Sequence, residues 1–174
     1  MGRYKTYITT RLLIRPVQIE DADFILALLN TEKFIQYIGD RNVRSIEDAE
    51  KYIRDKMSGQ FERLGFGNYA VIRKEDHKRI GTVGLYDREG LDAVDIGFAF
   101  LPEYEGQGYA LEAAEKILHA AFYDFNLPFV CAITTKDNYA SQKLIEKLGL
   151  KYIGTTEIPN DDEELLLYEL KKPD

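Results

Sequence analysis

Hydrophobic and polar positions repeat with two different periods along the chain, and these periods predict its elements. The clearest strand is 94–101, where large apolar residues occupy every even-numbered position up to Phe100. Asp95, Gly97 and Ala99 fall between them and would share the opposite face, since successive side chains of a strand alternate. In 109–125 the apolar residues recur every three or four positions, which predicts an amphipathic helix.

The same criteria assign the rest of the chain. Ser45 is a suitable N-cap for a helix that runs to about residue 63, with Asp48 at the capping-box position. Further helices are expected from 19–23 onward and over 141–148, where Gly149 would close the last one. The remaining predicted strands are 7–15 (stopped by Pro16), 68–73, 79–86, 129–135, 151–157 and 164–170.

This order predicts an α/β protein of the mixed-sheet (α+β) kind. The three adjacent strands 68–73, 79–86 and 94–101 predict antiparallel pairing, whereas the strand–helix–strand unit over 94–135 predicts a parallel crossover. No repeat, low-complexity tract or linker interrupts the sequence, so we expect one domain over 1–174.

Composition narrows the class of protein. Residues 1–15 contain no long apolar run, and no stretch is long enough to span a bilayer, so we expect neither a signal peptide nor membrane association, and a cytoplasmic location. The net charge of −7 argues against nucleic acid as a partner and is compatible with a cationic substrate such as an amine. The single cysteine, Cys131, excludes an internal disulfide.

The segment 101–110 lies between a predicted strand and a predicted helix and has the character of a phosphate-binding loop. Gly106 and Gly108 allow a tight turn that presents backbone N–H groups, and the start of the following helix attracts anions. It is neither a P-loop nor a dinucleotide fingerprint, because no G-x-x-x-x-G-K-[ST] run exists and Leu111 stands where a third glycine would be required.

These residues resemble the acetyl-CoA signature of the GNAT acetyltransferase superfamily. The similarity involves Ile96-Gly97-Phe98, Leu101-Pro102-Glu103-Tyr104 and Gly106-Gln107-Gly108-Tyr109-Ala110. It continues through Asn138-Tyr139-Ala140-Ser141 and Glu146-Lys147-Leu148-Gly149-Leu150, which are similar to the RimJ/RimL branch of ribosomal-protein N-terminal acetyltransferases.

The resemblance implies a binding site for acetyl-CoA as cosubstrate. The pantetheine arm would lie along Phe98, Ala99 and Phe100 like an added strand, helped by the small Gly97 and Ala99, and Asn138 would hydrogen-bond it. The pyrophosphate would be held by the backbone amides of Glu105, Gly106, Gln107, Gly108, Tyr109 and Ala110.

The chain departs from the family pattern at two positions. Glu105 stands where many members have Gln or Arg, and its carboxylate would repel a pyrophosphate unless it points away. Ile145 replaces the tyrosine that many members use as the acid for the leaving thiolate. Ser141 is the candidate to hydrogen-bond the thiolate instead, the alternative being a serine that only starts a helix.

Acetyl transfer to an amine also requires a proton acceptor. Asp95 is our first candidate for this base, because it shares a face with Gly97 and Ala99, and Glu103 is the second; an ordinary ion-paired aspartate is the alternative reading of Asp95. Cys131 is expected in the core rather than as a nucleophile. No cluster of His, Cys or carboxylate residues has metal-ligand spacing, so no metal is expected.

The predicted function is therefore transfer of an acetyl group from acetyl-CoA to a primary amine through a ternary complex. A protein or peptide N-terminus is the favoured acceptor. A small amine, such as a polyamine, aminoglycoside or amino acid, is the alternative, and a non-catalytic CoA-binding domain is a third. The sequence leaves formation of a homodimer open.

Overall fold

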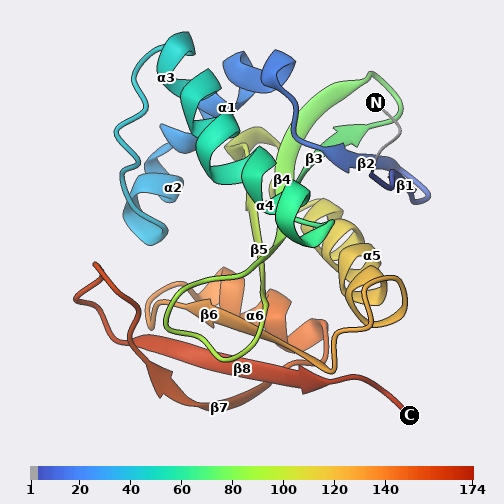
Figure 1. Cartoon of the computed structure of the whole chain (residues 1–174), viewed down its shortest axis with the longest axis vertical. Coiled ribbons are helices and arrows are strands. Elements are labelled where there is room, and N and C mark those ends of the chain that lie inside the picture. The colour runs from blue at the N-terminus through green and yellow to red at the C-terminus, as the bar shows by residue number, and fades with distance from the viewer. Residues whose placement is uncertain (1–3) are drawn as a thin grey trace.

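The computed structural model describes residues 4–174, which form one mixed sheet of eight strands in the order β1-β2-β3-β4-β5-β6-β8-β7 (Figure 1). Neighbouring strands are antiparallel except for β5 and β6, which are parallel. The strands are β1 (Tyr7–Ile8), β2 (Leu12–Pro16), β3 (Asn68–Arg73), β4 (Lys78–Tyr86), β5 (Asp95–Phe100), β6 (Phe129–Thr134), β7 (Lys151–Thr156) and β8 (Leu165–Lys171). The predicted mixed sheet with a parallel strand–helix–strand unit is confirmed.

Helices lie on both faces of this sheet. The α-helices are α1 (Ala22–Leu29), α2 (Glu32–Tyr37), α3 (Ile46–Tyr52), α4 (Gly59–Leu64), α5 (Tyr109–Tyr123) and α6 (Tyr139–Lys147). Short 3₁₀ turns occupy Ile19–Asp21 and Pro102–Tyr104, and a π-helical segment, Ile53–Ser58, joins α3 to α4. The predicted helix over 45–63 is thus present, and Ser45 caps it, its hydroxyl accepting from the Asp48 amide at 3.0 Å.

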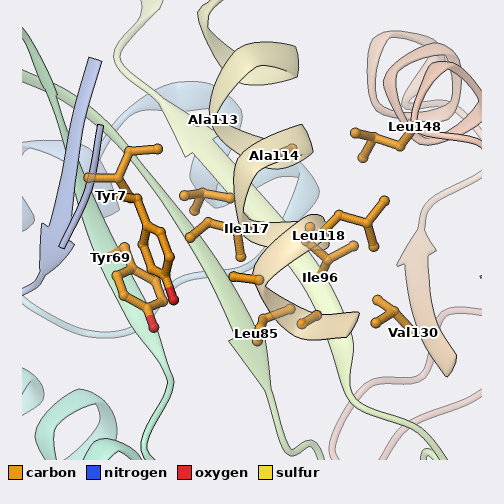
Figure 2. Close-up of a cluster of buried hydrophobic side chains, with 14 of the residues drawn as sticks. Tyr7, Tyr69, Leu85, Ile96, Ala113, Ala114, Ile117, Leu118, Val130 and Leu148 are labelled. Carbon is orange, nitrogen blue, oxygen red and sulfur yellow. The ribbon is translucent and has the colours of Figure 1, made fainter. Parts of the chain in front are cut away.

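The larger core lies between α5 and the sheet. Ala113, Ala114 and Ile117 of α5 are fully buried against strand residues that include Leu85 and Ile96 (Figure 2). These residues belong to the apolar stripes that the sequence predicts, and burial of such side chains is the dominant favourable contribution to folding. A second core on the other face joins α1 and α3 to Ala70 and Ile72 of β3.

One local prediction is wrong, and one helix was not predicted. The segment 7–15 is a hairpin rather than one strand, since Tyr7 pairs with Ile14 and the chain turns at residues 9–11. Pro16 is the last residue of β2 and pairs with Tyr69 of β3. The helix α2 was not predicted, although Thr31 caps it by accepting a hydrogen bond from the Phe34 amide at 3.3 Å.

The parallel strands β5 and β6 diverge soon after they meet. Their ladder register contains one pair, Asp95 with Cys131, and the Cys131 amide donates to the Val94 carbonyl at 3.0 Å. Beyond this point the carboxyl ends of the two strands separate, and the chain continues into α5 and toward α6 respectively. The divergence opens the sheet at the end where the predicted cofactor loop lies.

Candidate active site

A cleft of about 1270 Å³ runs from the divergence of β5 and β6 to the connection between α2 and α3. Eleven of the twelve residues proposed from the sequence as binding or catalytic line it. Gln107 is the exception: its side chain turns away and donates to the Glu103 carbonyl at 3.1 Å.

 Glu103, the second candidate base, is exposed outside the lining. The structure therefore brings the residues of β5 and the glycine loop into one cleft with Asn138 and Ser141, while the side chains of Gln107 and Glu103 lie outside it.

The loop before α5 has the geometry of an anion site. Gly106 and Gly108 have positive φ angles of 73° and 83°, a region that glycine enters without steric cost. Gly108 is the N-cap of α5, and no side chain caps this helix within the described residues, so its first backbone N–H groups remain available at the positive end of a 15-residue helix. These observations fit a bound pyrophosphate.

The edge of β5 that faces the divergence carries unpaired backbone groups. The Leu101 amide donates to Ile80 of β4 at 2.9 Å, whereas the Val94 carbonyl accepts from Cys131 of β6. Backbone groups alternate in direction along a strand, so those of Phe98 and Phe100 point toward β6, beyond the last ladder pair. An extended pantetheine arm could hydrogen-bond there as an added strand would.

The small residues of β5 have a different role from the one expected. An ideal Cβ on Gly97 would lie 2.9 Å from the Tyr86 ring, and one on Gly84 would lie 2.6 Å from it. The face that includes Gly97 is thus covered by Tyr86, and Ala99 packs against the core of α1 and α3. The absence of a side chain at Gly97 thus makes room for the Tyr86 ring. Another backbone could approach β5 along its open edge, but not over this face.

Asn138 and Ser141 lie together at the start of α6. The Asn138 Oδ1 caps the helix by accepting from the Ser141 amide at 3.3 Å, which leaves its Nδ2 group without a partner among residues 4–174. Ser141 is half-buried, faces the cleft from the first turn, and its hydroxyl has no partner in the same described range. Ile145, one turn further, also lines the cleft and supplies no acid.

Asp95 does not present a free carboxylate. It is 1% exposed and accepts two hydrogen bonds from Arg88, from Nε at 3.1 Å and from Nη2 at 3.4 Å. Burial raises the pKa of Asp95, and the Arg88 guanidinium opposes this rise. Asp95 is thus the ion-paired aspartate that the sequence analysis gave as the alternative. Its role as general base stays a prediction.

Glu105 is paired by a residue that the sequence did not single out. The Lys33 ammonium, on α2, lies 2.5 Å from the Glu105 Oε2. This hydrogen bond raises the pKa of Lys33. The expected repulsion between Glu105 and a pyrophosphate is therefore offset by a neighbouring cation.

The sequence did not single out Arg41 or Arg88 in this cleft, whereas Tyr86 is one of the tyrosines near strand ends that are candidates for an amine pocket. Arg41, Tyr86 and Arg88 also line the cleft, and Tyr86 donates to the Asn68 Oδ1 at 3.1 Å. Thr135, at the end of β6, has a buried hydroxyl without a partner within the described part of the chain. The polar run Thr134-Thr135-Lys136 at the end of a strand was a signal for Thr135. Nothing local marks Arg41 and Arg88.

Cys131 lies in the core, as expected. It is 2% exposed, and burial raises the pKa of its thiol to about 12, so a reactive thiolate is disfavoured. Within residues 4–174 no group of three or more His, Cys, Asp or Glu side chains could hold a metal ion, and no helix is long and apolar enough to cross a membrane.

Comparison with known proteins agrees with this geometry. The model of a family described as an acetyltransferase (GNAT) domain matches residues 11–151. The uncharacterized N-acetyltransferase YnaD of Bacillus subtilis is 30% identical over 149 residues, which are 85% of this chain and 84% of that protein.

Solved structures share the fold over almost the whole chain. A GNAT-family acetyltransferase from Bacillus anthracis has a TM-score of 0.80 at 25% identity, covering 98% of this chain and 100% of that one. The RimL ribosomal L7/L12 alpha-N-protein acetyltransferase, in complex with coenzyme A, has a TM-score of 0.80 at 16% identity, covering 96% and 98%. The chain belongs to the GNAT acetyltransferase family, and it is an N-acetyltransferase.

Proposed function

We propose that this enzyme transfers the acetyl group of acetyl-CoA directly to a primary amine in a ternary complex. The observation that carries this proposal is the open edge of β5, which leads from the glycine loop at Gly106 and Gly108 to the polar groups of Asn138 and Ser141. A pyrophosphate on the loop and a pantetheine arm along the edge would bring the thioester beside α6.

The chain's own residues would then perform three tasks. Backbone N–H groups on the edge of β5 would bind the thioester oxygen and the negative charge that develops on it. The Ser141 hydroxyl would donate a hydrogen bond to the leaving sulfur. The amine must lose a proton, for which Asp95 or a water chain is the candidate acceptor. Direct transfer is favoured because Cys131, the one thiol of the sequence, is buried away from the cleft.

For the acceptor we propose the N-terminal amine of a protein or peptide. The support is the RimL-like fold and a cleft that extends well past the cofactor side, to Tyr37 and Arg41. A small amine is the second candidate, favoured by the half-buried Tyr86 and Arg88 beside the buried Asp95. We take the part of the cleft that these residues line, together with Arg41, as its acceptor side.

Two measurements test the proposal. Acetyl-CoA should raise the melting temperature, and NAD or ATP should not, because only a ligand of the native state stabilises it. Release of free CoA thiol should then depend on an added amine, in a panel of short peptides and small amines. No thermal shift at millimolar acetyl-CoA would refute cofactor binding, and a shift without thiol release for any amine would favour a non-catalytic domain.

A further inference from the structure

The acceptor side of the cleft carries two arginines that the transfer reaction itself does not require. Arg88 lies in the connection between β4 and β5, two residues after β4 ends, and Arg41 lies in the connection between α2 and α3. Both line the cleft, and both lie near enough to the Tyr86 hydroxyl to lower its pKa, against the larger opposite effect of burial. Two segments that are far apart in sequence thus place guanidinium groups around one tyrosine.

Arg88 is held in place by its contacts. Asp95 engages its Nε and Nη2 atoms, and the guanidinium lies 5.4 Å from the centre of the Tyr86 ring. Its Nη1 atom has no hydrogen-bond partner in the described chain, and its side chain is 32% exposed. A fixed guanidinium with a free N–H edge is suited to an oxyanion, since less conformational entropy is lost on binding.

Arg41 adds a second charge without a matching carboxylate. It is exposed and forms no ion pair among residues 4–174, whereas the neighbouring Asp40 is paired with Arg44 at 2.6 Å. The acidic residues that line the cleft besides Asp95 are Asp40, Glu89, Glu105, Asp137, Asp161 and Glu163. The cleft therefore offers groups for a cation and for an anion.

We propose that the acceptor amine carries an anionic group, a carboxylate or a phosphate, which binds to Arg88 and Arg41. This inference rests on the proposed function and narrows its acceptor class. It applies equally to a peptide with an acidic side chain near its N-terminus and to a small amino acid or amino phosphate. Simple polyamines would be poor acceptors, because they would place only positive charge beside the two arginines.

The test uses pairs of acceptors that share the amine and differ in the anionic group. The pairs are β-alanine with propylamine, O-phosphoethanolamine with ethanolamine, and tripeptides that begin Ala-Glu with those that begin Ala-Gln. We expect kcat/KM to favour the charged member of at least one pair by roughly 10- to 100-fold, as for a hydrogen bond to a charged group. The pair that responds distinguishes a carboxylate from a phosphate and a peptide from a small molecule.

Variants then assign the preference to these residues. Arg88→Lys keeps a positive charge beside buried Asp95 but lacks the free Nη1, and Arg41→Gln changes an exposed side chain. Each should remove most of the preference by raising KM for the charged acceptor relative to its neutral partner, with the acetyl-CoA thermal shift unchanged. In Arg41→Gln the kinetics of the neutral acceptor should also stay as in the wild type. Arg63→Gln is the matched control, because Arg63 pairs with Asp87 on the same β4–β5 connection yet lies outside the cleft.

The outcomes separate this inference from the function on which it rests. If no amine releases thiol, the proposed function fails. If amines are acetylated but no charged member is preferred, the anionic acceptor is refuted. If the preference survives in both Arg88→Lys and Arg41→Gln, its binding to these two arginines is refuted. In both cases N-acetylation of an amine still stands.

Discussion

Replacing Gly108 by valine should separate cofactor binding from folding. Gly108 has φ 83° and ψ 2°, a left-handed conformation that a β-branched residue adopts only with strain of about 1–3 kcal/mol. The new Cβ would also lie 3.3 Å from the Arg11 Nη2, and the rest of the side chain would stand beside the loop amides. The variant should thus lose some stability and most of its affinity for acetyl-CoA.

Gly65 supplies a matched control for this substitution. It ends α4 with φ 83° and ψ 0°, almost the same backbone conformation, and lies outside the cleft. An ideal Cβ there meets no atom within 4 Å. Gly65→Val should therefore lose a similar free energy of unfolding and keep normal cofactor binding.

The assay is the melting temperature with and without acetyl-CoA. A ligand at 100 times its Kd stabilises the native state by about 2.7 kcal/mol, which corresponds to a rise of about 5–10 °C for a domain of this size. Wild type and Gly65→Val should show this rise, and folded Gly108→Val should show almost none. A full rise in Gly108→Val would place the phosphate elsewhere, and a lost rise in Gly65→Val would mean that strain alone abolishes binding.

Three further predictions concern single groups. Ser141→Ala should lower kcat by roughly 10- to 100-fold, the loss of one transition-state hydrogen bond, while the acetyl-CoA thermal shift stays unchanged; full kcat would exclude a role for its hydroxyl. Glu105→Gln should tighten acetyl-CoA binding at low salt, because Lys33 then acts on the phosphates without a competing carboxylate, and calorimetry that shows weaker binding would contradict this. Asp21 is buried, which raises its pKa, but its interactions with Arg15, the Gln18 amide and Arg79 together outweigh burial and lower it. Its stabilisation should be present above its unfolded pKa of about 3.9 and lost as the pH falls through the lower folded value. Asp21→Asn should cost about 3 kcal/mol in denaturant unfolding at pH 7, with a smaller difference from wild type at pH 2.

The sequence predicts the cofactor side of the site well because its signals are local. The strand 94–101, the glycines of the loop and the helix after them are adjacent in the chain, and their periodicity and turn chemistry define them without knowledge of distant partners. Contacts between distant segments could not be predicted. The break between β1 and β2 is an example, because Glu112 binds the Arg11 amide and the Thr9 hydroxyl at 2.9 and 2.5 Å from about a hundred residues away.

The acceptor side shows the same limit. The alternation in β5 correctly assigns a face to Asp95, yet its partner Arg88 lies in a connection without periodicity. The helix α2 has six residues, too few to show a helical repeat, and only Thr31 marks its start. Residues that contact an acceptor therefore come from segments whose sequence carries little structural signal.

The single ladder pair between β5 and β6 also has a mechanical consequence. The sheet has two parts, or plates, made of strands β1–β5 and strands β6–β8. Within the described chain, the only backbone ladder between the two plates is at the corner where Asp95 pairs with Cys131. A cofactor arm laid along β5 would act as a brace between the plates, so we expect the free enzyme to flex about this corner and the loaded enzyme to be stiffer. Because Arg88 is fixed to Asp95 at that same corner, it would keep its position while the plates move.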